Sequence, residues 1–493
     1  MSHQRLNLFS FSGKTKILHM TWMAFFITFV IWFSHAPLMM MIAQSLGLDK
    51  SQIKTILILN VALTIPARII IGILVDKFGP KRTYSALLAA GSLPCFMFAF
   101  ATSFEQLALA RFLSGFIGAG FVIGIRMVGE WFPAKQVGIA EGIYGGWGNF
   151  GSAAAAGTLP LLALAFGGAN GWRYAIASTG VIALIYSVIY FLNVSDTPKG
   201  STYFKPKKAG AMEVTSKGDR TFYILMTLPL YATLSLFTWK LSSAASANLL
   251  SMPVALSLYV GIWLMYFYNV AKIIHVNKEH LQQPIAAIHQ YKFKQVAILD
   301  LAYFITFGSE LAVVSMLPLY FFEIFHESQG ITMVQAGLLG GSFAFINLIA
   351  RPMGGWLSDK FGRKLSLSTF VLGLSLGYFG MSQINADWSI ALAVLLTMAC
   401  SCFVSAGCGA VYAIVPLIKR RMTGQIAGMV GAYGNVGGVL FLTVLSFVTP
   451  EMFFIVLGAA ALVILMAVQF IDEPKGHMAE IQEDGSVEMI ELH

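Results

Sequence analysis

Residues 67–81 read ARIIIGILVDKFGPK, and residues 350–364 read ARPMGGWLSDKFGRK. The two stretches share an arginine, a glycine, an Asp-Lys pair and a later glycine and lysine, all displaced by 283 residues. A second pair, residues 138–151 and 424–437, shares five glycines and an asparagine with a displacement of 286 residues. Two long-range repeats in the same order predict that the chain consists of two homologous halves.

The composition indicates what surrounds the chain. Of its 493 residues, 57% are hydrophobic and 11% are charged, whereas soluble proteins carry about 25% charged residues. Together with a mean hydropathy of +0.74, this predicts an all-α protein embedded in a lipid bilayer and excludes a soluble enzyme, a nucleic-acid binder and a disordered scaffold. Basic cytoplasmic loops explain the net charge of +9, so we expect no nucleic-acid partner.

Each half contains six apolar runs of the length, about 20 residues, that a membrane-spanning helix needs. The spans predicted in the first half are residues 18–42, 53–75, 83–102, 106–128, 138–166 and 172–193. Those predicted in the second half are residues 296–322, 333–356, 365–382, 389–415, 423–447 and 452–471. We therefore expect two pseudo-symmetric six-helix bundles, residues 1–194 and 296–471.

The segment between the bundles, residues 195–295, is basic and contains two further apolar runs, residues 222–239 and 248–271. We predict that both runs span the membrane as a helical hairpin, which gives 14 spans in total. Interfacial or re-entrant placement is the alternative. Residues 472–493 are acidic, and we expect them to form a disordered tail.

The distribution of positive charge predicts the orientation in the membrane. With the N-terminus in the cytoplasm, 24 of the 32 Lys and Arg residues fall in cytoplasmic segments and four fall in external loops. Because Lys and Arg concentrate in cytoplasmic loops, this asymmetry predicts that both termini are cytoplasmic. We expect a multi-pass protein of the plasma (bacterial inner) membrane.

The repeated motifs carry a family resemblance. The segment from Gly72 to Arg82 and its repeat, Gly355 to Lys364, resemble the loop motif of the major facilitator superfamily, and residues 107–120 resemble its fourth-helix motif. The glycine-rich segments around Asn149 and Asn435 resemble the paired signature of the nitrate/nitrite porter family. This resemblance implies the major facilitator fold, to which the hairpin at 222–271 is an addition.

Arg68 and Arg351 are the most informative single residues. Each lies eight residues before the aspartate of its loop motif, so roughly 12 Å of helix separates it from the cytoplasmic end. A charge near the middle of the membrane costs about 2.5 kcal/mol or more and normally faces a cavity on the substrate path. Snorkelling to the headgroups and pairing with a buried carboxylate are the alternatives.

Two facing guanidinium groups repel each other unless an anion lies between them. Their planar forks suit planar oxyanions, because two N–H donors engage two oxygens at once. Nitrate and nitrite fit this geometry, but so do phosphate and a carboxylate. The family resemblance favours nitrate and nitrite, and we predict that Arg68 and Arg351 bind them.

The resemblance implies further substrate contacts. In the family, the asparagines equivalent to Asn149 and Asn435 lie at or beside the nitrate site; an amide in an apolar helix needs a partner, and interhelical hydrogen bonding is the alternative role. Tyr303 lies in a segment similar to the family's seventh helix, where a tyrosine contacts substrate. Phe33 on the first span is a candidate for stacking on a planar ion. Ordinary packing is the alternative for both aromatic residues.

Glycines and loop carboxylates predict a mechanical role. Close approach of helix backbones is expected at Gly145, Gly148, Gly151, Gly431, Gly434 and Gly437. The loop motifs predict a cytoplasmic gate, in which a carboxylate at a helix end holds neighbouring dipoles and basic residues in one conformational state. The residues of this gate are Gly72, Asp76, Gly355 and Asp359.

Glu310 lies about 15 Å deeper in its span than Asp300 by helix rise. A carboxylate at that depth is protonated, paired with an arginine or in contact with water. Glu310 is therefore our candidate for proton coupling, with a structural ion pair as the alternative. Asp300, one turn from the cytoplasmic end, is expected to be solvated. Structural roles are expected for Arg111, Arg126 and Glu141.

The sequence thus predicts a secondary active transporter, not an enzyme, because it contains no nucleophile–base pair and no phosphate-binding GxxxxGK[ST] motif. Importing an anion against an inside-negative potential costs about 2.3 kcal/mol per 100 mV, and symport with two protons overcomes this cost. Exchange of nitrate for nitrite, or transport of another small anion, is the alternative. We expect a monomer whose partners are the anion, protons and the lipid bilayer. We expect no cofactor and no metal, since Cys400 and Cys402 have no His or acidic neighbours.

Overall fold

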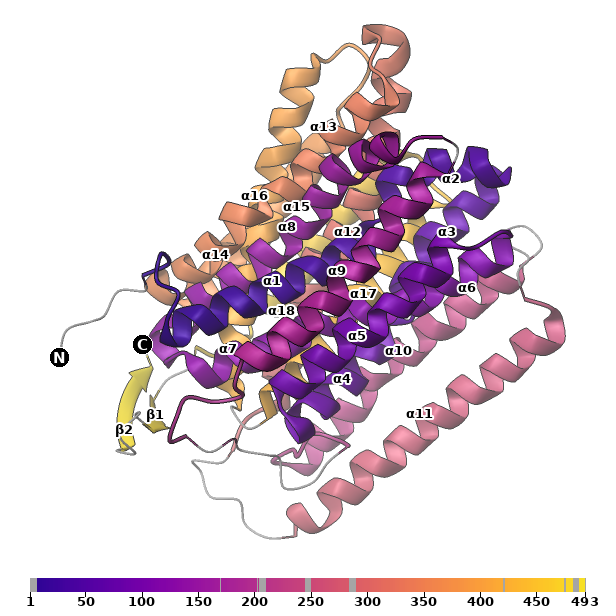
Figure 1. Cartoon of the computed structure of the whole chain (residues 1–493). Helices are drawn as coiled ribbons and strands as arrows, with labels where there is room; N and C mark the ends of the chain where they lie inside the picture. Colours follow the sequence, from indigo (N-terminus) through magenta and orange to yellow (C-terminus); the bar gives the residue numbers. More distant parts are fainter. Residues whose placement is uncertain are drawn as a thin grey trace.

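A computed structural model describes residues 7–168, 170–201, 203, 210–243, 250–282, 290–419, 422–473, 476–481 and 487–492. The described chain is a set of long helices packed side by side, followed by two short strands (Figure 1). Among the described residues, eleven helical stretches are long and apolar enough to cross a membrane. The remaining predicted spans, residues 53–75, 83–102 and 365–382, are also helical. The prediction of an all-α membrane protein is confirmed.

The first half folds as the helices of one bundle. They are α1 (Gly13–Phe33), η1 (Ala36–Leu38), α2 (Met39–Leu46), α3 (Lys50–Ala62), α4 (Thr64–Phe78), α5 (Pro80–Ala99), α6 (Phe104–Ser114), η2 (Gly115–Ala119), α7 (Gly120–Trp131), α8 (Ala134–Phe166) and α9 (Gly171–Asn193). The second half contributes α12 (Phe293–Gln329), α13 (Met333–Phe345), α14 (Asn347–Phe361), α15 (Arg363–Met381), α16 (Ile390–Ile418), α17 (Thr423–Leu445) and α18 (Pro450–Val468).

Several predicted spans are interrupted rather than continuous. The second span of each half breaks at an equivalent residue, Leu63 between α3 and α4 and Ile346 between α13 and α14. Pro66 contributes to the first break, because it has no N–H to donate to the preceding turn. The equivalent residue in the second half is Ile349, so proline does not explain the second break. Each break lies five residues before the buried arginine of that half.

Two equivalent helix pairs join the bundles. Helix α4 packs against α17, and helix α14 packs against α8. Glycines allow these backbones to approach closely, since a Cβ added at Gly72 would lie 2.6 Å from the carbonyl oxygen of Gly424. Any relative movement of the two bundles therefore has to change the contacts within these two pairs.

The segment between the bundles contains α10 (Lys217–Ser242) and α11 (Met252–His280). Helix α10 packs against α12 and α17, and the Tyr433 hydroxyl donates a hydrogen bond to the carbonyl of Met226 at 2.6 Å. Helix α11 lies beside α10 at the edge of the molecule (Figure 1). Most of its large apolar side chains are exposed, although Ile273 and Val276 near its end are buried. Such exposure is expected for contact with lipid. Both helices are long enough to span, and their spanning placement stays a prediction.

The prediction of a disordered tail is not supported by the described structure. Strands β1 (Gly476–Ile481) and β2 (Val487–Leu492) pair antiparallel, with Gly476 opposite Leu492. The acidic composition of the tail led to the wrong expectation.

Candidate anion-binding site

Arg68 on α4 and Arg351 on α14 are both buried, with 0% and 1% of their surface exposed. Each side chain reaches a glycine of the opposite bundle. A Cβ added at Gly431 would lie 2.9 Å from Nη1 of Arg68, and one added at Gly145 would lie 2.6 Å from Nε of Arg351. Gly145 and Gly431 occupy equivalent positions in the two halves, so the two arginines cross the bundle interface in the same way.

Replacing Gly431 with Ala is therefore expected to displace the Arg68 guanidinium and to raise the KM for the transported anion at least tenfold, about 1.4 kcal/mol. Gly157→Ala is the matched control, because a Cβ at this position on α8 meets no atom within 4 Å. The control is expected to keep the KM of the unmodified protein. Initial rates of labelled anion uptake into proteoliposomes give the KM of each variant. Equal KM values for the two variants would contradict this role of Gly431.

Both guanidinium groups retain N–H donors that have no acceptor within the described part of the chain. Nη1 of Arg68 donates to the carbonyl oxygen of Gly431 at 2.8 Å, and Nη2 of Arg351 donates to the hydroxyl of Tyr303 at 3.1 Å. Nε and Nη2 of Arg68 and Nη1 of Arg351 have no hydrogen-bond partner among the described residues. Buried charged donors left unpaired are costly, and an oxyanion supplies the acceptors they lack.

An aromatic ring lies close to both charges. The centroid of the Phe121 ring, on α7, lies 5.7 Å from Cζ of Arg68 and 5.1 Å from Cζ of Arg351. Phe307 on α12 lies 4.9 Å from Cζ of Arg68. Phe121 was not among the predicted site residues, because nothing in the sequence distinguishes it among 39 phenylalanines.

Phe33 occupies a different place. Its ring packs at 5.5 Å from that of Phe29 and at 5.2 Å from that of Trp32. The ring contacts described for Phe33 include neither Arg68 nor Arg351. The ring that lies close to both arginines belongs to Phe121, which is on the fourth span and not on the first.

Tyr303 lies with the arginines. Its ring stacks on Phe307 with centroids 4.9 Å apart and an interplanar angle of 8°. Because its hydroxyl oxygen accepts a hydrogen bond from Arg351, the hydroxyl hydrogen points elsewhere and is a donor for an anion. A buried tyrosine in this position adds a neutral donor to the two charged ones.

The two asparagines differ in their surroundings. Nδ2 of Asn435 donates at 3.0 Å to the Gly431 carbonyl, the same oxygen that accepts from Arg68. The Asn149 side chain is buried, and neither its nitrogen nor its oxygen has a partner within the described part of the chain. Asn149 follows Gly145 by one helical turn and therefore shares its face of α8.

Glu310 and Asp300, both on α12, are buried. Glu310 accepts a hydrogen bond from Nδ2 of Asn347 at 2.7 Å and interacts electrostatically with Arg351. The expectation that Asp300 is solvated is wrong: its exposed fraction is 0%. Helix α12 begins at Phe293, earlier than the predicted span, and α10 covers this end of it.

The residues predicted to form the gate lie at two equivalent contacts between the bundles. Asp76 lies 3.3 Å from Nε of Arg126 and accepts a hydrogen bond from the backbone N–H of Gln425, in the first turn of α17, at 3.1 Å. Asp359 pairs with Arg363 at 3.0 Å and lies against Gly138 of α8. A Cβ at Gly355 would likewise meet the backbone of Gly138.

The other predicted packing glycines also meet neighbouring helices. A Cβ at Gly434 would lie 2.6 Å from the Tyr303 ring. Added Cβ atoms at the remaining three would collide with side chains or carbonyls of α1 and α12; these glycines are Gly148, Gly151 and Gly437.

Two other buried arginines have protein partners. Arg111 donates a hydrogen bond to the carbonyl of Trp32, and Arg126 also pairs with Glu130 at 2.9 Å.

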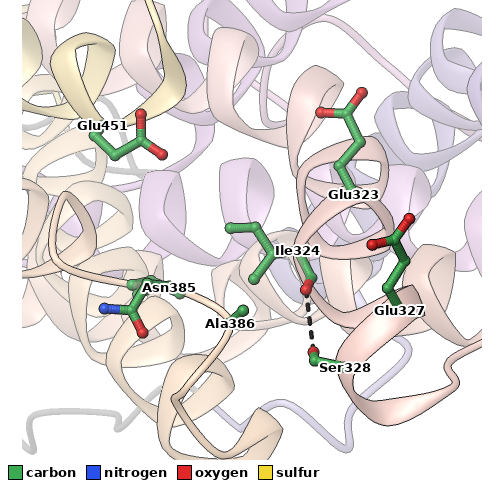
Figure 2. Close-up of a pocket in the computed structure, with 8 residues that line it drawn as sticks. Glu323, Ile324, Glu327, Ser328, Asn385, Ala386 and Glu451 are labelled. Atoms are coloured by element: carbon green, nitrogen blue, oxygen red, sulfur yellow. Dashed lines mark hydrogen bonds between the residues drawn. The ribbon is translucent and has the colours of Figure 1, made fainter.

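A cavity of about 470 Å³ lies away from the arginines, where the end of α12 meets α18 and the loop after α15. Figure 2 shows the carboxylates of Glu323, Glu327 and Glu451 around it. Three carboxylates repel an anion. The arginine pair, and not this cavity, is therefore the candidate site for an anion.

Two helical bundles built from related halves, with paired charges buried between them, are typical of membrane transporters. The family model for the Major Facilitator Superfamily matches residues 21–285 and 299–490. The solved proton:xylose symporter XylE shares this fold, with a TM-score of 0.59 and 15% identity over 93% of this chain and 97% of that one.

Two curated relatives define the group more narrowly. The nitrate/nitrite transporter NrtP of a Picosynechococcus species is 48% identical over 98% of this chain and 97% of its own length. The nitrate/nitrite transporter NrtP of Nostoc punctiforme is 46% identical over 97% and 96%. The chain belongs to the major facilitator superfamily and, within it, to the nitrate/nitrite porter family; it is a multi-pass membrane transporter and not an enzyme.

Proposed function

We propose that the protein imports nitrate, and also nitrite, by alternating access, with proton coupling. The observation that carries this proposal is the pair of buried arginines, one from each bundle, whose unsatisfied N–H groups lie around one aromatic ring. Nitrate and nitrite are planar monoanions that accept hydrogen bonds in the plane of the guanidinium forks. The names of the two NrtP relatives support the same substrates.

The bundle contacts support the alternating-access part of the proposal. In the described structure the Asp76 and Asp359 contacts join the bundles at the end that the charge distribution assigns to the cytoplasm. An anion held by arginines from both bundles favours their approach, because it neutralises the repulsion between them. Opening towards the cytoplasm then requires α4 to separate from α17 and α14 from α8. We place the protein in the plasma (bacterial inner) membrane as a monomer with both termini in the cytoplasm.

Proton coupling rests on Glu310, which is buried beside Arg351. Protonation removes its negative charge and leaves Arg351 free to hold the anion. Exchange of nitrate for nitrite is the competing mode, because it is electroneutral and needs no titrating group.

The test is uptake of labelled nitrate into proteoliposomes with an inward proton gradient and no internal anion. Gradient-driven uptake is expected for the unmodified protein, and Glu310→Gln is expected to reduce the stimulation by the gradient at least tenfold. Vesicles loaded with nitrite and given no gradient form the second arm. Uptake in the nitrite-loaded vesicles alone would mean that the protein exchanges nitrate for nitrite and is not a proton symporter.

A further inference from the structure

We propose that Glu141 is a second proton-accepting group, which acts with Glu310 on the same arginine, Arg351. The inference rests on the proposed function and deepens it, since it assigns two protons to each anion imported. It also departs from the structural role that the sequence predicted for Glu141.

Glu141 lies on α8, in the interface between the bundles. Its exposed fraction is 2%, and neither carboxylate oxygen has a hydrogen-bond partner among the described residues. The next residue, Gly142, brings the helix backbone against α14, since a Cβ there would lie 2.6 Å from Cα of Pro352. A structural carboxylate normally has its acceptors satisfied, and this one does not.

Glu141 lies one helical turn before Gly145 on α8, and a Cβ added at Gly145 would lie 2.6 Å from Nε of Arg351. The nearby charge with which Glu141 interacts electrostatically is this guanidinium. Glu310 also interacts electrostatically with Arg351, and it belongs to α12 of the second bundle. Arg351 therefore has two buried carboxylates near it, one from each bundle, and a remaining N–H group without an acceptor among the described residues. Both carboxylates compete with a bound anion for this guanidinium.

Among the described residues, Arg68 has no equivalent pair of carboxylates. The residue that corresponds to Glu141 under the 286-residue displacement is Ala427. The interactions described for Arg68 include no carboxylate; they are with Gly431, Phe121, Phe307, Tyr303 and Tyr412. The negative charges of the site are thus not pseudo-symmetric, which indicates that the two arginines have different roles.

The other ionisable groups near the two carboxylates are neutral in the physiological pH range. Tyr144 interacts with Glu141 from α8 itself. Cys408 on α16 and Tyr378 on α15 interact with Glu310, and Asn347 donates a hydrogen bond to it. Charge in this part of the site therefore changes through Glu141 and Glu310, with Arg351 constant.

The charge balance links protons to the anion. With both carboxylates ionised, the two arginines and two glutamates have no net charge, and a nitrate ion would make the site negative. With both carboxylates protonated, the empty site is doubly positive and the nitrate-loaded site is singly positive. An inside-negative potential then favours reorientation of the protonated, nitrate-loaded site towards the cytoplasm. The empty, deprotonated site returns to the outside without moving net charge.

The test is the number of protons transported per nitrate, measured from the reversal of nitrate flux at opposing pH gradients in proteoliposomes. The unmodified protein is expected to carry two protons and Glu141→Gln one. A potential of 100 mV should raise nitrate accumulation about 50-fold in the unmodified protein and leave it unchanged in the variant. Asp300→Asn is the matched control, as it removes another buried carboxylate of the interior and should retain two protons.

Two protons per nitrate in Glu141→Gln would overturn the inference without affecting the proposed function. Nitrate-for-nitrite exchange as the only activity of the unmodified protein would overturn the proton-coupled function itself. A second measurement needs no variant: proton uptake on nitrate binding, from calorimetry in buffers of different ionisation enthalpy. As pH is varied, the number of protons taken up per nitrate bound is expected to rise above one at its maximum. A number of one or less at every pH would also overturn the inference.

Discussion

Arg68→Ala is expected to weaken nitrate binding by a factor of about 30 or more while the empty protein keeps its stability. Removing one buried charged partner of an ion costs about 2–5 kcal/mol of binding free energy. The empty protein loses little, because Nε and Nη2 of Arg68 have no acceptor among the described residues. Titration calorimetry measures the affinity, and thermal unfolding of the purified protein measures the stability.

Two further variants control this result. Arg68→Lys keeps the charge and loses the planar fork, so an intermediate affinity is expected. Arg351→Ala should lower both affinity and thermal stability, because it leaves the buried carboxylates of Glu141 and Glu310 without their positive neighbour. Nitrate binding by Arg68→Ala within about threefold of the unmodified protein would contradict the assignment of the site.

Asp76→Asn is expected to reduce nitrate uptake at least tenfold and to leave equilibrium nitrate binding nearly unchanged. The substitution keeps the shape of the side chain but removes the charge that faces Arg126 and the first turn of α17. Breaking a buried ion pair costs about 3–5 kcal/mol. The pair with Arg126 lies within the first bundle and holds the carboxylate that accepts the Gln425 N–H of the second bundle. The conformation closed on the cytoplasmic side is thereby destabilised.

Asp359→Asn is the matched control at the equivalent position. Its ion-pair partner, Arg363, lies on the next helix and the Asp359 side chain is 14% exposed, against 1% for Asp76. A smaller loss of uptake is therefore expected. Labelled uptake and calorimetric affinity are measured on the same preparations. A tenfold loss of affinity with normal uptake per bound anion would place Asp76 in the binding site instead of the gate.

The fold could be predicted from the sequence because the motifs that indicate it occur once in each half. The same arginine, glycine and aspartate spacing occurs twice, 283 residues apart, and spans of apolar residues are long enough to be found without a structure. Depth counted from the loop aspartate also placed Arg68 and Arg351 correctly in the interior. These predictions depend on distances along one helix, which are fixed by its rise.

Features that depend on contacts between distant segments were not predictable in the same way. Phe121 lies near arginines from both halves because α7 packs against α4 of the first bundle and against α16 and α17 of the second. The burial of Asp300 depends on α10, which lies outside the twelve-helix pattern. Glu141 looked structural as one acidic residue in an apolar helix, and only the structure shows that its oxygens have no partner among the described residues.

The most direct test of the central claim is counterflow of labelled nitrate, since this assay needs neither a proton gradient nor nitrite. Proteoliposomes are loaded with unlabelled nitrate, diluted into a trace of labelled nitrate, and compared with vesicles loaded with nitrite or with phosphate. Transient accumulation of label is expected with internal nitrate and nitrite, and none with phosphate. Absence of accumulation with internal nitrate, or equal accumulation with phosphate, would contradict a nitrate site built from Arg68 and Arg351.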